Sequence, residues 1–164
     1  MRTASALVYL ALAYPAAAQL PKATATDSPV WASVLAAVYP DSVRVTIADS
    51  TVSLERAPRS ATRWLPWSSV DDTAAFNDML DRNRQAFLIT SAVRDSLASA
   101  PRSRAGGPQR FVRFARPGFN ARHDVAFVYG QFTCGLMCNW DEGFVLELHN
   151  GAWVVVARRR YSVS

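Results

Sequence analysis

Residues that build metal and redox centres are scarce in this chain. Its 164 residues include only two cysteines, Cys134 and Cys138, and two histidines, His123 and His149. A structural zinc site needs four such ligands at characteristic spacing, and neither histidine lies at zinc-finger spacing from the cysteines. Three residues separate the cysteines, whereas a thioredoxin-type redox motif has two. The sequence therefore predicts no metal site and no cofactor.

The familiar catalytic motifs are also missing. The chain has no G-x-S-x-G nucleophile elbow, no H-E-x-x-H motif, no phosphate-binding glycine loop and no Rossmann fingerprint. A Ser/His/Asp triad would have to use one of the two histidines, and triads are recognised by geometry, not by sequence order. We therefore favour a non-enzymatic protein and keep an enzyme as the alternative.

No hydrophobic run is long enough to span a membrane, which takes roughly 20 apolar residues. The shorter run Ala4–Ala13 follows the positive charge of Arg2 and precedes the small residues 16–18. This is the layout of a secretory signal peptide. We expect residues 1–18 to be cleaved and the mature protein, beginning at Gln19, to be secreted or periplasmic with no transmembrane segment.

Arginine supplies nearly all the positive charge, since Lys22 is the only lysine. Without Arg2 the mature chain has 17 basic and 13 acidic residues, a net charge of +4. That charge favours contact with anionic polymers of the cell envelope. Residues 110–119 mix arginines with phenylalanines, as binders of single-stranded nucleic acid also do. We assign these phenylalanines to a buried strand and expect no nucleic-acid partner, which leaves a small ligand, an envelope polymer or a protein.

Hydrophobic periodicity predicts one α+β domain over residues 28–164, after a flexible leader at 19–27. Apolar residues recur at helical spacing over about 29–39. Asp71-Asp72 opens a second helix, and Ser91 caps a third. We expect two or three short helices to pack on one face of a mostly antiparallel sheet of about five or six strands.

Alternation of apolar and polar residues predicts the strands. Residues 42–56 predict two strands joined by a tight turn, and 111–115, 125–133 and 144–149 predict three more. Asn150-Gly151 is typical of a type I′ turn, in which both positions need positive φ. Pairing around this turn opposes Leu148 to Trp153, Leu146 to Val155 and Phe144 to Ala157, with all six on the core side.

Cys134 and Cys138 flank the segment 135–137, and we expect them to form a disulfide across a tight hairpin. Opposed residues in an antiparallel pair have Cα atoms about 4.5 Å apart, near the short end of disulfide geometry. Closing so small a loop stabilises the fold by roughly 2 kcal/mol. Two free thiols, or a redox or metal-binding pair, are the alternatives.

The candidate ligand-binding residues follow the second cysteine directly. Asn139, Trp140, Asp141 and Glu142 place an amide, an indole and two carboxylates on a predicted loop, and Arg116 is the candidate from the basic region. Such a group could bind a cation or a sugar, or the carboxylates could act as acid and base in a small hydrolase-like enzyme. Neighbouring carboxylates usually diverge, so we favour a binding or envelope-associated module. An enzyme using Asp141 or Glu142 as acid/base is the alternative.

The C-terminal half carries an ordered set of residues, namely Arg116-Pro117-Gly118-Phe119-Asn120, Ala126-Phe127-Val128-Tyr129, Cys134-Gly135-Leu136-x-Cys138, Gly143, Asn150-Gly151-x-Trp153-x-Val155 and the closing Ser162–Ser164. In these residues the chain resembles a family of uncharacterised secreted bacterial proteins, with a fainter match at Phe76–Asn83. It departs from the family at Trp140-Asp141-Glu142 and at Tyr161–Ser164, where the family more often has a tryptophan before its final serine. The resemblance implies secretion and a shared domain, and transfers no catalytic residue.

Overall fold

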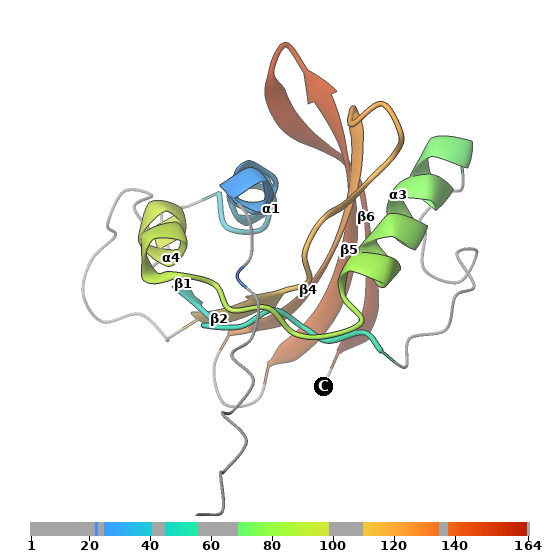
Figure 1. Ribbon diagram of the computed structural model, residues 1–164. Coiled ribbons are helices and arrows are strands. Elements are labelled where there is room, and N and C mark those ends of the chain that lie inside the picture. The colour runs from blue at the N-terminus through green and yellow to red at the C-terminus, as the bar shows by residue number, and fades with distance from the viewer. Residues whose placement is uncertain are drawn as a thin grey trace, which may run out of the picture.

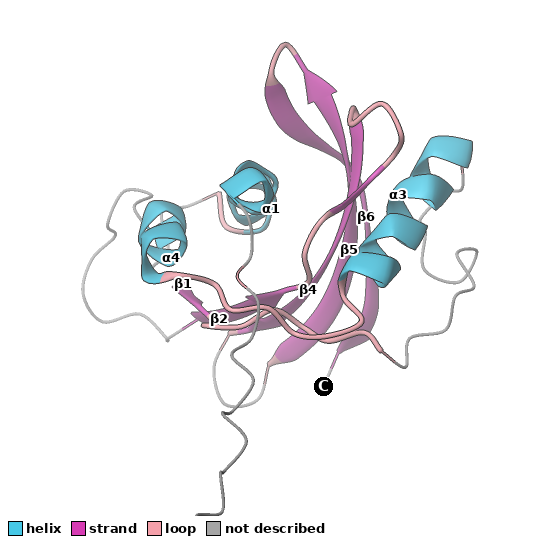
Figure 2. Ribbon diagram, viewed as in Figure 1, coloured by secondary structure: helices cyan, strands magenta, loops and turns pink. Residues whose placement is uncertain are grey.

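The computed structural model describes residue 22 and residues 25–40, 45–55, 69–98, 110–134 and 138–163. Within these ranges the chain forms three α-helices and a six-stranded, mostly antiparallel sheet (Figure 1, Figure 2). The predicted α+β class is therefore confirmed. The predicted signal peptide at 1–18 lies outside the described residues.

Helices form at the three places where the sequence predicts them. The helical elements are η1 (Ala25–Asp27), α1 (Ser28–Val38), α3 (Val70–Arg82) and α4 (Ser91–Ala98). A capping box begins α3, because Ser69 Oγ accepts from the Asp72 amide at 3.0 Å and Asp72 Oδ2 accepts from the Ser69 amide at 3.1 Å. Pro29 lies in the first turn of α1, where its missing amide hydrogen costs nothing.

The strands are β1 (Val45–Ile47), β2 (Arg110–Phe114), β3 (Gly118–Phe119), β4 (Val125–Thr133), β5 (Asn139–His149) and β6 (Ala152–Val163). Their order across the sheet is β1-β2-β4-β5-β6, and β3 pairs with β4 outside that path. β5 begins at Asn139, which pairs with Thr133. Residues 139–142 therefore lie on a strand, and their prediction as a loop is wrong, because pairing with β4 continues up to the cysteine turn.

The predicted hairpin over residues 42–56 does not form within the described part, 45–55. Instead β1 runs parallel to β2, with Val45 opposite Arg110. Farther along, the Val52 amide donates to the Phe114 carbonyl at 2.8 Å, so the segment after β1 stays beside β2. Period-two alternation identifies an extended segment but does not identify its partner, and here the partner comes much later in the chain.

The central strand β4 is buried on both faces. Neighbouring side chains of a strand point to opposite sides of the sheet. Ala126 and Val128 of β4 pack with the α1 and α4 side chains, whereas Phe127 and Tyr129 pack with those of α3. Figure 1 shows α1 and α4 on one side of the sheet and α3 on the other. The expectation that all helices cover one face is therefore wrong, because the near-continuous apolar run of β4 needs cover on both.

The β5–β6 hairpin has the predicted turn. Asn150 and Gly151 both have positive φ, 51° and 80°. Two predicted pairs, Leu148–Trp153 and Leu146–Val155, are confirmed. The third is wrong, because a register shift between Val145 and Leu146 places Ala157 opposite Val145. Ala157 therefore packs with the α3 side chains, on the other face of the sheet.

Candidate functional site

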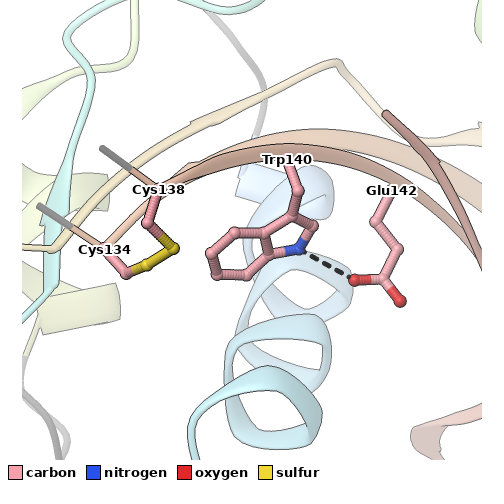
Figure 3. The surroundings of a disulfide bond; sticks show 4 residues. All are labelled: Cys134, Cys138, Trp140 and Glu142. Atoms are coloured by element: carbon pink, nitrogen blue, oxygen red, sulfur yellow. Dashed lines mark hydrogen bonds between the residues drawn. A yellow bond between two sulfur atoms is a disulfide. The ribbon is translucent and has the colours of Figure 1, made fainter. Parts of the chain in front are cut away.

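Cys134 and Cys138 form the predicted disulfide, with Cα atoms 5.2 Å apart (Figure 3). The Cys134 amide also donates to the Cys138 carbonyl at 2.9 Å, which closes the β4–β5 turn. Thr133 and Asn139 are the last paired residues before this turn. The disulfide therefore fixes the end of the sheet where the sequence places the ligand site.

The ring of Trp140 is in contact with other side chains of the protein. Its indole N–H donates to Glu142 Oε2 at 3.0 Å (Figure 3). The ring stacks on Phe132, with centroids 5.2 Å apart and planes 14° from parallel. The Arg160 guanidinium lies over it at 5.1 Å. These neighbours leave little aromatic surface for a ligand.

The two predicted acid/base residues do not converge. The Glu142 carboxylate is 4% exposed and lies 3.6 Å from Arg158 Nε and 3.8 Å from an Arg160 nitrogen. Asp141 points to the opposite face of the sheet, where it accepts from Ser162 Oγ at 3.1 Å. Asn139 is exposed at the start of β5. Glu142 therefore forms buried ion pairs, and the side chains of Asp141 and Glu142 do not meet at one catalytic centre.

Arg116 belongs to a different cluster, built around Asp27. Asp27 is fully buried; its Oδ2 accepts from Arg116 Nε at 2.8 Å and its Oδ1 from Arg82 at 3.0 Å. The Arg116 guanidinium also lies 4.6 Å from the Phe87 ring centroid. Asp27 was predicted in the flexible leader, but two arginines from later in the chain hold it in the core, so the ordered fold includes it.

An open pocket of about 740 Å³ lies at the other end of β5 from the disulfide. Pro29 of α1 lines it together with Asp78 and Arg82 of α3. Phe119 of β3 and Trp153, just after the β5–β6 turn, supply its aromatic surface. Segments distant in the sequence therefore meet at one cavity.

The aromatic side chains of this pocket form one connected group. The Phe119 ring stacks on His123 at 5.2 Å, with planes 24° apart, and lies 5.7 Å from the Trp153 ring at 48°. The Arg82 guanidinium lies 5.2 Å from the Phe119 centroid. Phe119 is thus fixed by its neighbours, while Trp153 is half-buried at the rim. We call Phe119, His123, Trp153, Asp78 and Arg82 the hairpin-end pocket.

Backbone contacts hold this pocket in shape. A Cβ on Gly118 would lie 2.0 Å from the Met79 amide nitrogen, so β3 and α3 touch backbone to backbone. The Phe119 amide donates to Asp78 Oδ2 at 2.8 Å, and Arg82 donates to the Pro117 carbonyl. These contacts attach the aromatic strand β3 directly to the charged end of α3.

The loop after β3 positions His123. Its φ of 57° is left-handed, and its amide donates to the Asn120 carbonyl at 3.0 Å. Buried Asn120 also donates to Asp124 at 2.6 Å, while Arg122 donates to Asp124 at 2.9 Å. The hydrogen bond from Arg122 holds the pKa of Asp124 below its usual value. These polar contacts brace the loop, and Asn120 itself also lines the pocket.

Sequence reasoning missed the residues of the hairpin-end pocket. Arg82 resembles an ordinary basic residue in the last turn of a helix, and His123 a residue at a strand end. One signal was available for Trp153, because the Asn150-Gly151 turn places it near the hairpin tip. Nothing local indicated that Phe119 and Asp78 would meet it.

Among the described residues no cluster of His, Cys, Asp and Glu could hold a metal ion, and no helix is long and apolar enough to cross a membrane. Comparisons with protein-family models, with curated proteins and with solved structures find no match to this chain.

Proposed function

We propose that this protein is a secreted or periplasmic binding module that takes a small organic ligand into the hairpin-end pocket. The observation that carries the proposal is the pocket itself, an open cavity of about 740 Å³ with aromatic walls. Ligand sites are typically concave and mostly apolar, with a few placed polar groups. Export is supported by the signal-like N-terminus, and the disulfide is of a kind that persists in oxidising compartments.

The pocket offers polar groups that the protein does not use. Asp78 Oδ2 accepts from the Phe119 amide, and no described residue is bonded to its Oδ1. The Trp153 indole N–H and the exposed His123 ring likewise have no hydrogen-bond partner among the residues that the structure describes. The side chains that line this partly apolar cavity therefore include one acceptor and two potential donors that could orient a ligand.

An acid/base role for Asp141 or Glu142 lacks comparable support. Their side chains lie on opposite faces of β5, and neither lines the hairpin-end pocket. Efficient acid/base catalysis needs both groups within reach of the same substrate. Binding without catalysis therefore explains more of the geometry.

Native mass spectrometry tests the proposal. The exported protein would be mixed with a library of small organic fragments, neutral, anionic and cationic, alongside the variants Trp153→Ala and Trp140→Ala. Trp140 is the matched control, because it is also half-buried but lies at the disulfide end. We expect adducts on the wild type and on Trp140→Ala that disappear from Trp153→Ala. Adducts unaffected by Trp153→Ala, or no adduct from any class, would overturn the proposal.

Intact mass of the same exported protein tests its location. We expect a chain that begins at Gln19 and is two hydrogens lighter before reduction than after it. A full-length chain with free thiols would contradict export.

A further inference from the structure

We infer that the ligand of the hairpin-end pocket is a neutral saccharide, bound with the C–H face of one sugar ring against Trp153. This inference rests on the proposed function, because it names the ligand class of the same pocket. Three features of the pocket carry it: its charge balance, its mixture of hydrogen-bond groups and its partly exposed indole.

The charges at the pocket cancel within the protein. Arg82 pairs with buried Asp27 at 3.0 Å and approaches Asp78 at 4.0 Å, while Arg116 takes the second oxygen of Asp27. Two positive and two negative groups therefore neutralise one another. An anionic ligand would meet an arginine that already has carboxylate partners, and a cationic ligand would meet Arg82 close to Asp78. A neutral ligand does not have to compete with these ion pairs and is not repelled by either charge.

The unused hydrogen-bond groups suit hydroxyl ligands. Asp78 Oδ1 can only accept, the Trp153 indole N–H can only donate, and His123 can do either according to its tautomer. A hydroxyl group is both donor and acceptor, so a ring that carries several hydroxyls can satisfy all three residues together. A purely apolar ligand would desolvate these groups without replacing their hydrogen bonds.

Trp153 provides the flat surface that a sugar ring requires. The indole is half-buried, and its ring is tilted at 48° to the Phe119 ring. Trp140, by contrast, has Phe132 stacked at 14° and Arg160 over its ring. An exposed aromatic face packs against the apolar C–H face of a pyranose by dispersion and area burial. Trp153 lines the pocket and Trp140 does not, so the hairpin end is where an indole can meet a ligand.

Isothermal titration calorimetry and saturation-transfer NMR with trisaccharides of known charge test this inference. The neutral set is tri-N-acetylchitotriose, maltotriose and mannotriose. The charged set is deacetylated chitotriose, which is cationic, and trigalacturonate, which is anionic. The variants are Trp153→Ala, the milder Asp78→Asn, and Trp140→Ala as control. Asp78→Asn keeps an acceptor for the Phe119 amide, so it tests the free oxygen without removing the contact that shapes the pocket. The fragment library is titrated in parallel.

We expect at least one neutral trisaccharide to bind, and both charged trisaccharides to bind about tenfold more weakly than it or worse. Trp153→Ala should weaken that binding by about tenfold or more and Asp78→Asn by about fivefold, with Trp140→Ala unchanged. If no neutral saccharide binds while a fragment binds through Trp153, the saccharide inference fails and the proposed pocket stands. If nothing binds through Trp153, both fail. Tighter binding of a charged sugar would also overturn the inference.

Discussion

The ring of Phe119 lies 5.7 Å from that of Trp153, although Phe119 belongs to the two-residue strand β3 and Trp153 to the final strand β6. The two rings are close together because each is positioned by a backbone feature of its own. Gly118 allows β3 to touch α3, and the Asn150-Gly151 turn brings β6 back along β5. The proposed binding site therefore depends on the packing of β3, α3 and the β5–β6 hairpin. A variant that disturbs this packing should affect both stability and binding.

The first prediction contrasts the two half-buried tryptophans. Trp153→Ala should remove ligand binding and cost about 1–2 kcal/mol of unfolding free energy, since it loses only part of a buried surface. Trp140→Ala should leave binding intact and cost about 3 kcal/mol, because it removes the Phe132 stack and the hydrogen bond to buried Glu142. Urea unfolding and ligand titration on both variants measure the contrast. Equal effects of the two variants on binding would contradict it.

The second prediction concerns the buried carboxylate at the start of α1. Asp27→Ala should cost about 3–5 kcal/mol of unfolding free energy, because it leaves Arg82 and Arg116 without their shared partner. The control is Glu147→Ala, which breaks an exposed pair with His149 and should cost under about 1 kcal/mol. Urea midpoints compared at equal m-values give both numbers. Similar small losses for the two variants would show that Asp27 does not anchor the N-terminal segment.

A third prediction tests how closely β3 and α3 approach. Gly118→Ala should cost about 3 kcal/mol, since its new methyl group would meet the Met79 backbone. Gly151→Ala is the matched control; nothing lies within 4 Å of its Cβ, so it bears only the strain of a positive φ, about 1 kcal/mol. Thermal unfolding of both variants decides the point, and a neutral Gly118→Ala would mean that the two elements can separate freely.

Removing the disulfide should lower the stability of the protein without changing its affinity for the ligand. The double variant Cys134→Ser with Cys138→Ser should lose about 2 kcal/mol, the chain-entropy value for so short a loop. Binding at the hairpin end should stay unchanged, because the disulfide closes the opposite end of β5. Calorimetric titration at a temperature where the variant is fully folded measures this. A lost affinity would place the ligand at the disulfide end instead.

The fifth prediction concerns alkaline pH. Burial raises the pKa of Tyr129 and Tyr161 above the usual 10.0. Unfolded tyrosines ionise near pH 10 while the folded ones stay neutral, so the stability is fully present below about pH 10 and falls as the pH rises further. Urea midpoints between about pH 8 and pH 11 should show the fall, and the variant Tyr129→Phe with Tyr161→Phe should reduce it. An identical fall in the double variant would assign it to other groups.

Local signals in the sequence predicted much of the fold. The bounds of β4, the position of α4 and the Asn150-Gly151 turn follow from apolar spacing and turn chemistry that neighbouring residues determine. Ser91, predicted as the cap of α4, is its first residue. The partner of β1 could not be predicted from such local signals, because Val45 pairs with Arg110, which lies much later in the chain. Periodicity carries no information about such a pairing.

The candidate site was harder to predict for the same reason. Trp140 and Glu142 are candidates from the sequence because they follow the second cysteine closely, but in the structure they contact each other and their own sheet. The pocket residues come from α3, β3 and β6, and each has an ordinary local sequence. Asp27 lies in a polar stretch typical of a leader, and only the two arginines that reach it make it part of the core.

The position of the bound ligand tests the central claim most directly. In a ¹H–¹⁵N correlation spectrum each tryptophan contributes one resolved indole N–H signal, so Trp153 and Trp140 report on opposite ends of β5. Titration with the bound fragment or trisaccharide should shift the Trp153 indole signal in proportion to occupancy and leave that of Trp140 in place. A shift confined to Trp140, with Trp153 unmoved at saturation, would contradict the hairpin-end pocket as the binding site.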